Sequence, residues 1–436
     1  MAHLIGDMVR SIGLPTLKRA AGAITRRVPI RQPMLMIGPG SSARLGRTLA
    51  AFAHRRILVV TDETIARLGL MAPMTEALAA GGASFVVFDR VLPDAPIPVI
   101  EEGIALFGEE ECDAIVAFGG GSVMDTAKAI GLAAANAKHP RDLVGYFKGL
   151  HGPTPLYAVP TTAGTGSEVT VAAVISDPAE QRKLVIADTR LVPRMAALDP
   201  CLMTGVPADV TAATGLDALT HAVEAYIGRW STAFSDRMAL AAVAMIFANL
   251  PRAFADGADL VAREQMALAS TFAGLAFTRA SVGNVHAIAH QLGGRYHTPH
   301  GLANAIMLPI VLRLCEASAR PKLATLARRA GVGAAGVSDA ALAPKFIDAV
   351  EALNRSLAIP HQLDALREDD IAALADAACR EADANYPVPC VMSREACEGL
   401  LREALPTQPR RRRPVARGRQ AMPPTKTAAR AKPVRG

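Results

Sequence analysis

Short apolar runs alternate with amphipathic stretches along the first half of this chain, and this alternation restricts the folds open to it. Four runs predict buried strands, and they cover residues 57–62, 83–89, 113–120 and 156–162. Three stretches have helical spacing, and they cover residues 63–82, 97–111 and 124–137. Strands that alternate with helices form a parallel sheet with helices on its faces. We therefore expect an α/β domain over residues 33–204.

Strand signals end near residue 205, and the rest of the chain predicts only helices. Apolar residues recur there at spacings of three and four positions, which is typical of helices with one buried face. The segments with this spacing are 208–227, 233–250, 258–277, 282–293, 301–318, 340–356 and 369–384. We expect residues 205–405 to form an all-helical domain.

The basic residues of the chain gather at its two ends. Residues 406–436 contain ten Lys or Arg and no Asp or Glu, and residues 1–31 contain six Lys or Arg and one acidic residue. The formal net charge of +7 therefore belongs to the ends, and it does not predict a basic catalytic surface. We expect an N-terminal extension over residues 1–32 and a disordered basic tail over residues 406–436.

The composition indicates a globular protein of the cytoplasm. Hydrophobic residues make up 51% of the 436 positions, but no run of eighteen apolar residues occurs, so we expect no membrane-spanning helix. The six cysteines form no C-x-x-C pair, which is typical of reduced, structural thiols in a cytosolic protein. No secretory signal is recognisable, and the Arg-rich residues 8–27 leave an organellar transit peptide as an alternative.

Histidines cluster in the second half, where four of the ten fall within fifteen positions. His286 and His290 are four residues apart, so their rings share one face of a helix, and His300 follows on a loop. Asp217 and His221 have the same spacing on another predicted helix. A carboxylate with three or four imidazoles and no thiolate is typical of a site for a first-row divalent metal, rather than a structural zinc site. The alternative is that these are solvated or hydrogen-bonded core histidines.

Three features of the first half indicate a nucleotide site. Three glycines at 119–121 follow a strand and Ser122 opens a helix, so backbone N–H groups could hold a pyrophosphate. Asp62 ends the first strand, where a carboxylate can bind an adenosine ribose and repel a 2′-phosphate, which favours NAD over NADP. Small and hydroxyl residues at 159–170 suit close contact with a nucleotide. The alternatives are a tight turn, a helix N-cap and a capping loop, respectively.

Five segments together resemble the iron-containing (group III) alcohol dehydrogenase family. They are GGGSVMDTAKAIG, VPTTAGTGSEVT, TGLDALTHAVEAY, AGLAF and VHAIAHQLGGRYHTPHGLANAIMLP, and they occur in the family's order within about residues 34–405. The long histidine segment is a highly specific motif. The resemblance implies a dehydroquinate synthase-like fold, with an α/β N-terminal dinucleotide-binding domain, an all-helical C-terminal domain and an active site between them.

The resemblance also implies roles for individual residues. The metal, Fe²⁺ with Zn²⁺ as the alternative, would be bound by Asp217, His221, His286 and His300. His290 would be catalytic, as a proton-relay or positioning residue near the nicotinamide rather than a ligand, and Phe277 would line the substrate pocket. NAD would lie against Asp62, Gly119, Gly120, Gly121, Ser122, Thr161, Thr162, Thr165 and Lys183.

The implied reaction is the metal- and NAD-dependent oxidation of primary alcohols, or the reduction of aldehydes, by hydride transfer. The substrate would be a small molecule. The enzyme would be a homodimer or a larger homo-oligomer. One alternative within the superfamily is a glycerol-type polyol dehydrogenase. Another is a dehydroquinate synthase-like lyase, which would need more basic residues near the metal than Arg279, Arg295 and His297 provide.

Two parts of the chain depart from the family pattern. Family members often have Asn where this chain has Arg279, which could attract a carboxylate if it faced the active site, although exposed Arg is the more common case. The basic tail lies outside the resemblance and could bind polyanions in a salt-dependent way. Because the tail has no aromatic residues to stack on bases, such binding would be non-specific.

Overall fold

A computed structural model describes residues 29–180, 182–334 and 336–406. The described residues up to Leu405 form one compact unit. Most of the expected N-terminal extension lies outside the described residues. The basic tail beyond residue 406 also lies outside them. Both expectations remain predictions.

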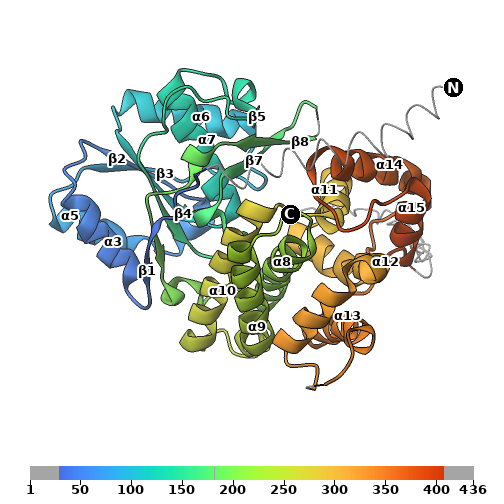
Figure 1. Ribbon diagram of the computed structural model, residues 1–436. Coiled ribbons are helices and arrows are strands. Elements are labelled where there is room, and N and C mark those ends of the chain that lie inside the picture. The colour runs from blue at the N-terminus through green and yellow to red at the C-terminus, as the bar shows by residue number, and fades with distance from the viewer. Residues whose placement is uncertain (1–28, 181, 335, 407–436) are drawn as a thin grey trace, which may run out of the picture. The chain divides into compact units, whose positions relative to one another are not determined.

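A six-stranded parallel sheet forms the centre of the first half (Figure 1). Its order is β1 (Met34–Ile37), β9 (Met195–Leu198), β6 (Leu156–Pro160), β4 (Ala114–Gly119), β2 (Ile57–Val60) and β3 (Phe85–Phe88). Every residue of β2, β4, β6 and β9 is buried, as expected for parallel strands covered on both faces. The four predicted strands are β2, β3, β4 and β6, so the α/β prediction is confirmed.

Alternate residues of these strands pack against helices on opposite faces of the sheet. Helices α3 (Ser41–Ala50) and α5 (Ala72–Ala80) share a core cluster with Ile57 and Val59. Helices α6 (Ile97–Glu109) and α7 (Gly121–Asn136) share another with Leu58 and Val60. The single helix predicted over 63–82 is wrong, because α4 (Glu63–Arg67) ends before Gly69, whose φ of 68° interrupts the helix ahead of α5.

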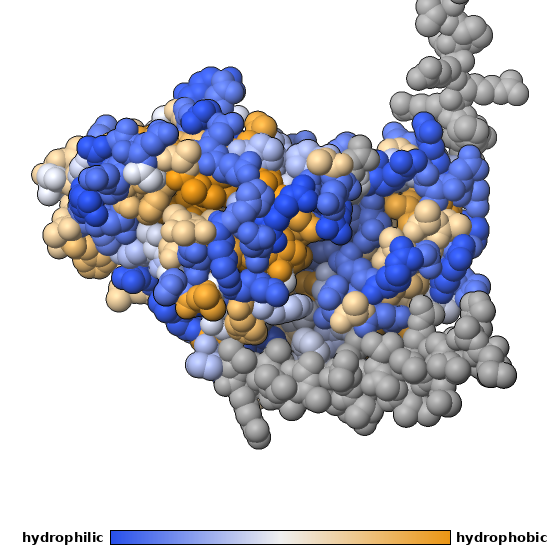
Figure 2. All heavy atoms as spheres, turned by 90° about the horizontal axis from the view of Figure 1, so that it is seen from above, coloured by the Kyte–Doolittle hydropathy of each residue, from blue (hydrophilic) through white to orange (hydrophobic). Residues whose placement is uncertain are grey.

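A second, three-stranded sheet was not predicted. It has the order β5 (Gly145–Tyr146), β8 (Arg182–Ala187) and β7 (Ala172–Asp177), with β7 and β8 antiparallel. Beside β5, the large hydrophobic side chains of Phe147 and Leu150 are exposed. Figure 2 views the protein from above and shows hydrophobic residues grouped amid a mostly polar face. The second sheet leads from the parallel sheet toward the helical half and positions one predicted site residue, described below.

The second half consists of helices around a single large core cluster, as predicted. The helices are α8 (Ala208–Ile227), α9 (Ala233–Ala255), α10 (Leu260–Ala280), α11 (Asn284–Tyr296), α12 (His300–Arg329), α13 (Asp339–Ser356), α14 (Glu368–Asn385) and α15 (Arg394–Glu403). The periodicity predicted all of these except α15. Among the described residues, four short 3₁₀ helices precede them along the chain, at Pro140–Leu143, Ser167–Val169, Thr189–Leu191 and Pro200–Met203.

Two of these helices, α9 and α12, are long and apolar enough to cross a membrane by length and composition alone. In α12, 67% of the most apolar window is buried inside the protein, where the helix packs against α8 and α13. Helix α9 packs against α8 and α10. Both helices therefore contribute buried apolar residues to the core of the helical half, although only 39% of the apolar window of α9 is buried.

Candidate active site

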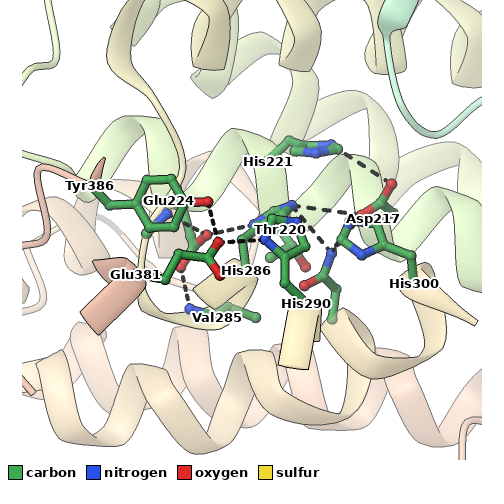
Figure 3. Close-up of polar contacts among 12 residues, drawn as sticks. Asp217, Thr220, His221, Glu224, Val285, His286, His290, His300, Glu381 and Tyr386 are labelled. Atoms are coloured by element: carbon green, nitrogen blue, oxygen red, sulfur yellow. Dashed lines mark hydrogen bonds and ion pairs between the residues drawn. The ribbon is translucent and has the colours of Figure 1, made fainter. Parts of the chain in front are cut away.

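Four predicted metal ligands come together in the helical half (Figure 3). Asp217 and His221 lie on α8, His286 lies on α11, and His300 begins α12. Each offers one ligand atom, and these four atoms lie within 4.8 Å of one another. All except the partly exposed His300 are buried. Residues up to 83 positions apart are thus close enough to bind one ion.

The carboxylate of Asp217 lies between the imidazoles. Its Oδ1 atom is 3.6 Å from Nε2 of His300 and 3.9 Å from Nε2 of His286, and its Oδ2 atom is 3.9 Å from Nδ1 of His221. A close approach between two helices makes this arrangement possible. A Cβ atom on Gly301 would lie 2.3 Å from the carbonyl oxygen of Ala213, so only glycine allows the start of α12 to reach α8.

The protonation states of the histidines suit a metal site. Burial lowers the pKa of His221, lowers the pKa of His300 to about 4 and lowers the pKa of His286 well below its ordinary value. The rings are therefore neutral near pH 7, as metal ligands must be. Among the described residues, the buried Nδ1 atom of His221 has no hydrogen-bond partner. An unpartnered ring nitrogen facing a carboxylate, in a donor set of oxygen and nitrogen, fits a divalent ion such as Fe²⁺ or Zn²⁺.

Two residues that sequence reasoning missed support the four. The Nδ1 atom of His286 lies 2.7 Å from Oε2 of Glu224, which is seven residues after Asp217 on α8. Because a carboxylate only accepts, Nδ1 carries the hydrogen and Nε2 keeps its lone pair for a metal. The Nδ2 atom of Asn304, one turn after His300, donates to Oδ1 of Asp217 over 2.7 Å. Helical spacings of four and seven from the ligands could have identified both residues.

His290 lies beside the four residues and has its own carboxylate partner. Its ring stacks on that of His300, with centroids 5.3 Å apart, and its Nδ1 atom is 2.6 Å from Oε1 of Glu381 on α14. The Tyr386 hydroxyl donates to the same oxygen over 2.6 Å, and the Gln291 amide donates to Oε2 over 2.7 Å (Figure 3 shows the tyrosine). Burial alone would raise the pKa of Glu381, but these hydrogen bonds outweigh it and lower the pKa. Sequence reasoning missed Glu381, because no spacing relates α14 to α11.

Two residues at the end of α10 have different surroundings. The ring of Phe277 stacks on the imidazole of His221, with centroids 4.3 Å apart and an angle of 21° between the planes. Phe277 therefore borders the candidate metal site with an apolar surface. The guanidinium of Arg279 donates to the carbonyl of Ile30 over 3.2 Å, and burial lowers its pKa.

The predicted nucleotide residues lie at the ends of β2, β4 and β6. The Thr161 N–H donates to the Gly119 carbonyl over 3.1 Å, and a Cβ atom on Gly121 would lie 2.7 Å from Cγ2 of Thr165. The glycine turn and the 159–170 loop are therefore in contact, and Thr162 lies next to Gly120. Asp62 caps α4, because its carboxylate accepts from the Ile65 N–H over 2.9 Å. Asp62 is therefore a helix N-cap, which was the alternative to a ribose-binding role. This cap uses one carboxylate oxygen and leaves the second one able to bind a ribose.

Lys183, on β8, connects this region with the helical half. Its Nζ atom lies 2.8 Å from Oδ1 of Asp94, whose backbone N–H donates to the Ser122 hydroxyl over 3.1 Å. The same Nζ atom is 3.8 Å from the position of a Cβ atom on Gly293, in α11. The second sheet therefore carries a cation to a point between the glycine turn and the histidine helix.

The 159–170 loop also touches the helical half directly. A Cβ atom on Gly164 would lie 2.8 Å from Cβ of Thr214 on α8. A Cβ atom on Gly166, whose φ is 60°, would lie 2.7 Å from the carbonyl oxygen of Ser270 on α10. The predicted nucleotide loop is thus packed against the helix that carries Asp217 and His221.

Comparisons with known proteins cover both halves of the chain. The family described as iron-containing alcohol dehydrogenase matches residues 33–200, and its C-terminal counterpart matches residues 211–405. The NAD-dependent methanol dehydrogenase of Bacillus methanolicus is 39% identical over 345 residues, which are 79% of this chain and 91% of that protein. The lactaldehyde reductase of Escherichia coli K12 is 39% identical over 345 residues, or 78% of this chain and 90% of that protein. A crystal structure of 1,3-propanediol oxidoreductase has a TM-score of 0.83 and 36% identity, and the match covers 87% of this chain and 100% of that one.

Proposed function

The chain belongs to the iron-containing alcohol dehydrogenase family, and from this we propose how its residues divide the oxidation of an alcohol by NAD. The protein is a metal- and NAD-dependent alcohol dehydrogenase, which converts alcohols and aldehydes into one another. The observation that supports our assignment of the site is the approach of four ligand atoms to within 4.8 Å of one another.

We assign metal binding to Asp217, His221, His286 and His300, within a metal-binding domain of residues 205–405. A bound divalent ion supplies Lewis-acid polarisation of the alcohol oxygen, and bound NAD supplies the acceptor for the hydride. Glu224 orients the His286 ring through Nδ1 and so directs Nε2 toward the site. The apolar ring of Phe277 beside His221 limits the water that reaches the ligands on that side.

His290 is the residue that we assign to proton movement. Since Glu381 accepts from Nδ1, the Nε2 atom of His290 is free to take the proton that the alcohol loses, and the ring can then pass it toward water. His290 is partly exposed, so such a route to solvent is short. In the reverse direction the same atom returns a proton to the product.

We assign NAD binding to the α/β domain, residues 33–204. Backbone N–H groups at the start of α7 face the turn formed by Gly119, Gly120, Gly121 and Ser122, where a pyrophosphate would be bound. Asp62 would bind the adenosine ribose and disfavour NADP. Thr161, Thr162, Thr165 and Lys183 would contact the nicotinamide half, because their segments adjoin the helices that carry the histidines.

The substrates that we propose are small primary alcohols and diols. Relatives named for methanol, lactaldehyde and 1,3-propanediol support this class. The lyase alternative has less support, because Arg295, one of its candidate basic residues, is paired with Asp370 over 2.9 Å. A glycerol-type polyol remains a competing substrate and belongs in the same panel.

The experiment that tests this function removes two ligands at once. The double variant D217A/H286A should lose bound metal and should produce no NADH from ethanol, butanol or 1,3-propanediol after loading with Fe²⁺ or Zn²⁺. The control is His297→Asn, which changes an exposed histidine of the same motif and should keep both properties. A double variant that oxidises alcohols as well as the parent does would rule out the assignment.

We further propose a cytoplasmic homodimer or larger homo-oligomer. Among the described residues, β1 is an edge strand that exposes Met34 and Ile37, and an edge with apolar side chains suits pairing with a second copy. Light scattering on the purified protein distinguishes a monomer from an oligomer.

Removing the basic tail from residue 406 onward should leave the dehydrogenase activity intact and should reduce retention on a polyanion column, with a strong dependence on salt.

A further inference from the structure

Two cysteines that are 75 positions apart in the sequence meet in the helical half. The Sγ atoms of Cys315, on α12, and Cys390, between α14 and α15, are 2.8 Å apart. Cys315 is 1% exposed, whereas Cys390 is partly exposed. No motif contains the two cysteines, so their contact could not be predicted from the sequence. One residue of the pair is therefore partly exposed, and its sulfur is in contact with that of the buried one.

The segment that carries Cys390 is held in place by hydrogen bonds to two other elements. The Nδ2 atom of Asn284, at the start of α11, donates to the Cys390 carbonyl over 3.1 Å and lies about equally far from the two sulfurs, at 3.9 and 4.0 Å. The backbone N–H of Arg229 donates to the Pro387 carbonyl over 2.7 Å, and its guanidinium donates to the Pro389 carbonyl over 3.0 Å. These hydrogen bonds are accepted by backbone carbonyl groups, and they hold the segment of Cys390 beside Cys315.

The two thiols differ in their acidity. The hydrogen bond from Cys315 lowers the pKa of the Cys390 thiol, burial opposes this effect, and the charge of Arg229 adds to the lowering. The hydrogen bond to Cys390 raises the pKa of Cys315, and burial raises it further. The partly exposed Cys390 therefore provides the better nucleophile, and the buried Cys315 keeps its proton.

We propose that Cys315 and Cys390 are a modification site, at which a small-molecule disulfide such as oxidised glutathione closes a reversible intramolecular disulfide. In the first step the Cys390 thiolate attacks one glutathione sulfur, a mixed disulfide forms, and one glutathione thiolate leaves. In the second step the Cys315 sulfur attacks the Cys390 sulfur, the second glutathione leaves, and the Cys315 proton goes to it. The two protein sulfurs are oxidised by two electrons, and one oxidised glutathione is reduced to two thiols.

Bond formation needs little movement of the protein. A disulfide bond is about 2.05 Å long, so sulfurs that start 2.8 Å apart need to approach by less than about 1 Å. The bridge would tie α12 to the segment between α14 and α15, which also carries the Tyr386 partner of Glu381. Because the bridge closes a long loop of the unfolded chain, oxidation should raise the melting temperature.

The test uses the full-length, zinc-loaded protein carrying Cys201→Ser, which removes the exposed lone thiol and leaves five. After incubation with oxidised glutathione, a thiol assay in denaturant should find three thiols instead of five. The intact mass should fall by two hydrogen atoms, peptide mapping should join the peptides with residues 315 and 390, and dithiothreitol should reverse all three changes. Zinc replaces iron so that the metal itself does not oxidise the sulfurs.

Two further variants establish the order of events. With Cys315→Ser, the reaction should stop at a glutathione adduct on Cys390, whereas with Cys390→Ser neither adduct nor bridge should form. Circular dichroism and retained zinc verify that each variant is folded, and Cys315→Ala replaces Cys315→Ser if the buried hydroxyl prevents folding. A second cysteine contact, between Cys379 and Cys397, provides the alternative bridge. Five thiols remaining in the Cys201→Ser protein, or a bridge that joins Cys379 to Cys397 instead, would overturn the proposal.

Discussion

The Nδ1 atom of His286 lies 2.7 Å from Oε2 of Glu224, and the same carboxylate accepts hydrogen bonds from the backbone N–H groups of Gly283 and Val285. One side chain of α8 therefore caps the start of α11 and orients a candidate ligand on it. Burial raises the pKa of Glu224 to about 7, although the backbone donors oppose this shift.

Replacing Glu224 with Gln should weaken metal binding. The amide presents N–H groups where two backbone donors and the imidazole need an acceptor, so the His286 ring loses its orientation. We expect the affinity for Zn²⁺ to fall by about 10- to 100-fold, as is usual when the partner of a ligating histidine is removed. Competition with a chelator measures the change. The control is Asp209→Asn, an exposed acidic residue of α8, which should bind zinc like the parent.

Replacing Glu381 with Gln should slow catalysis without affecting cofactor binding. His290 would lose the carboxylate acceptor that fixes its tautomer. Tyr386 and Gln291 would lose the carboxylate to which they donate hydrogen bonds. We expect kcat to fall by about 10- to 100-fold, less than the loss of about 10²–10⁴ when a general acid or base is removed outright. The KM for NAD should not change. Glu368→Gln alters an exposed glutamate on the same helix and should have parental kinetics. A normal kcat in Glu381→Gln would argue against a relay through His290.

Replacing Gly301 with Ala should destabilise the protein and displace His300. The new methyl group would lie 2.3 Å from the Ala213 carbonyl oxygen, so α12 would have to move away from α8. We expect the free energy of unfolding to fall by about 1–3 kcal/mol, with weaker metal binding as well. Gly294→Ala is the matched control, because nothing lies within 4 Å of its Cβ position in α11. That variant should gain up to about 1 kcal/mol through its higher helix propensity. Urea denaturation of both variants gives the comparison.

The stability of the protein should rise between about pH 8 and pH 10.5 because of Lys128. Its ammonium group is buried and donates to Ser167, Thr170 and the Ala172 carbonyl, and burial lowers its pKa from 10.5 to about 8. In this pH range the unfolded chain binds more protons than the folded one, so the free energy of unfolding increases with pH, by on the order of 3 kcal/mol.

Denaturation of the parent and of Lys128→Met at several pH values measures this contribution. The variant should be less stable overall, since it leaves hydroxyl and carbonyl groups without their donor, and its stability should lack the rise with pH. Lys345→Met removes an exposed lysine and should keep the parental slope. A parental curve that is flat from pH 8 to pH 10 would contradict the assignment to Lys128.

The sequence predicted the parallel sheet and the helical half because their signals are local. Ile57–Val60 and Ala114–Gly119 are continuous apolar runs, and α8 shows its period over twenty residues. The second sheet was missed although β7 and β8 have six residues each, because polar and apolar residues do not alternate regularly along them. The break at Gly69 was missed because the residues around it are good helix formers.

The same distinction holds for the candidate site. The four metal-binding candidates and Phe277 stand in recognisable motifs, and the structure brings them together, although their role as ligands stays a prediction. Glu381 and the pair of Cys315 and Cys390 depend on α14 and the segment after it, which reach α11 and α12 only through tertiary packing. No spacing along the chain encodes such contacts.

The glycines of the 159–170 loop have a consequence for engineering. Gly164 and Gly166 pack so closely on α8 and α10 that the two halves of the protein are in direct backbone contact at this point. A hybrid enzyme that joins the first half of one relative to the second half of another would have to take this loop and both helices from a single parent. Preferences for nucleotide and for metal would therefore be inherited together when such proteins recombine.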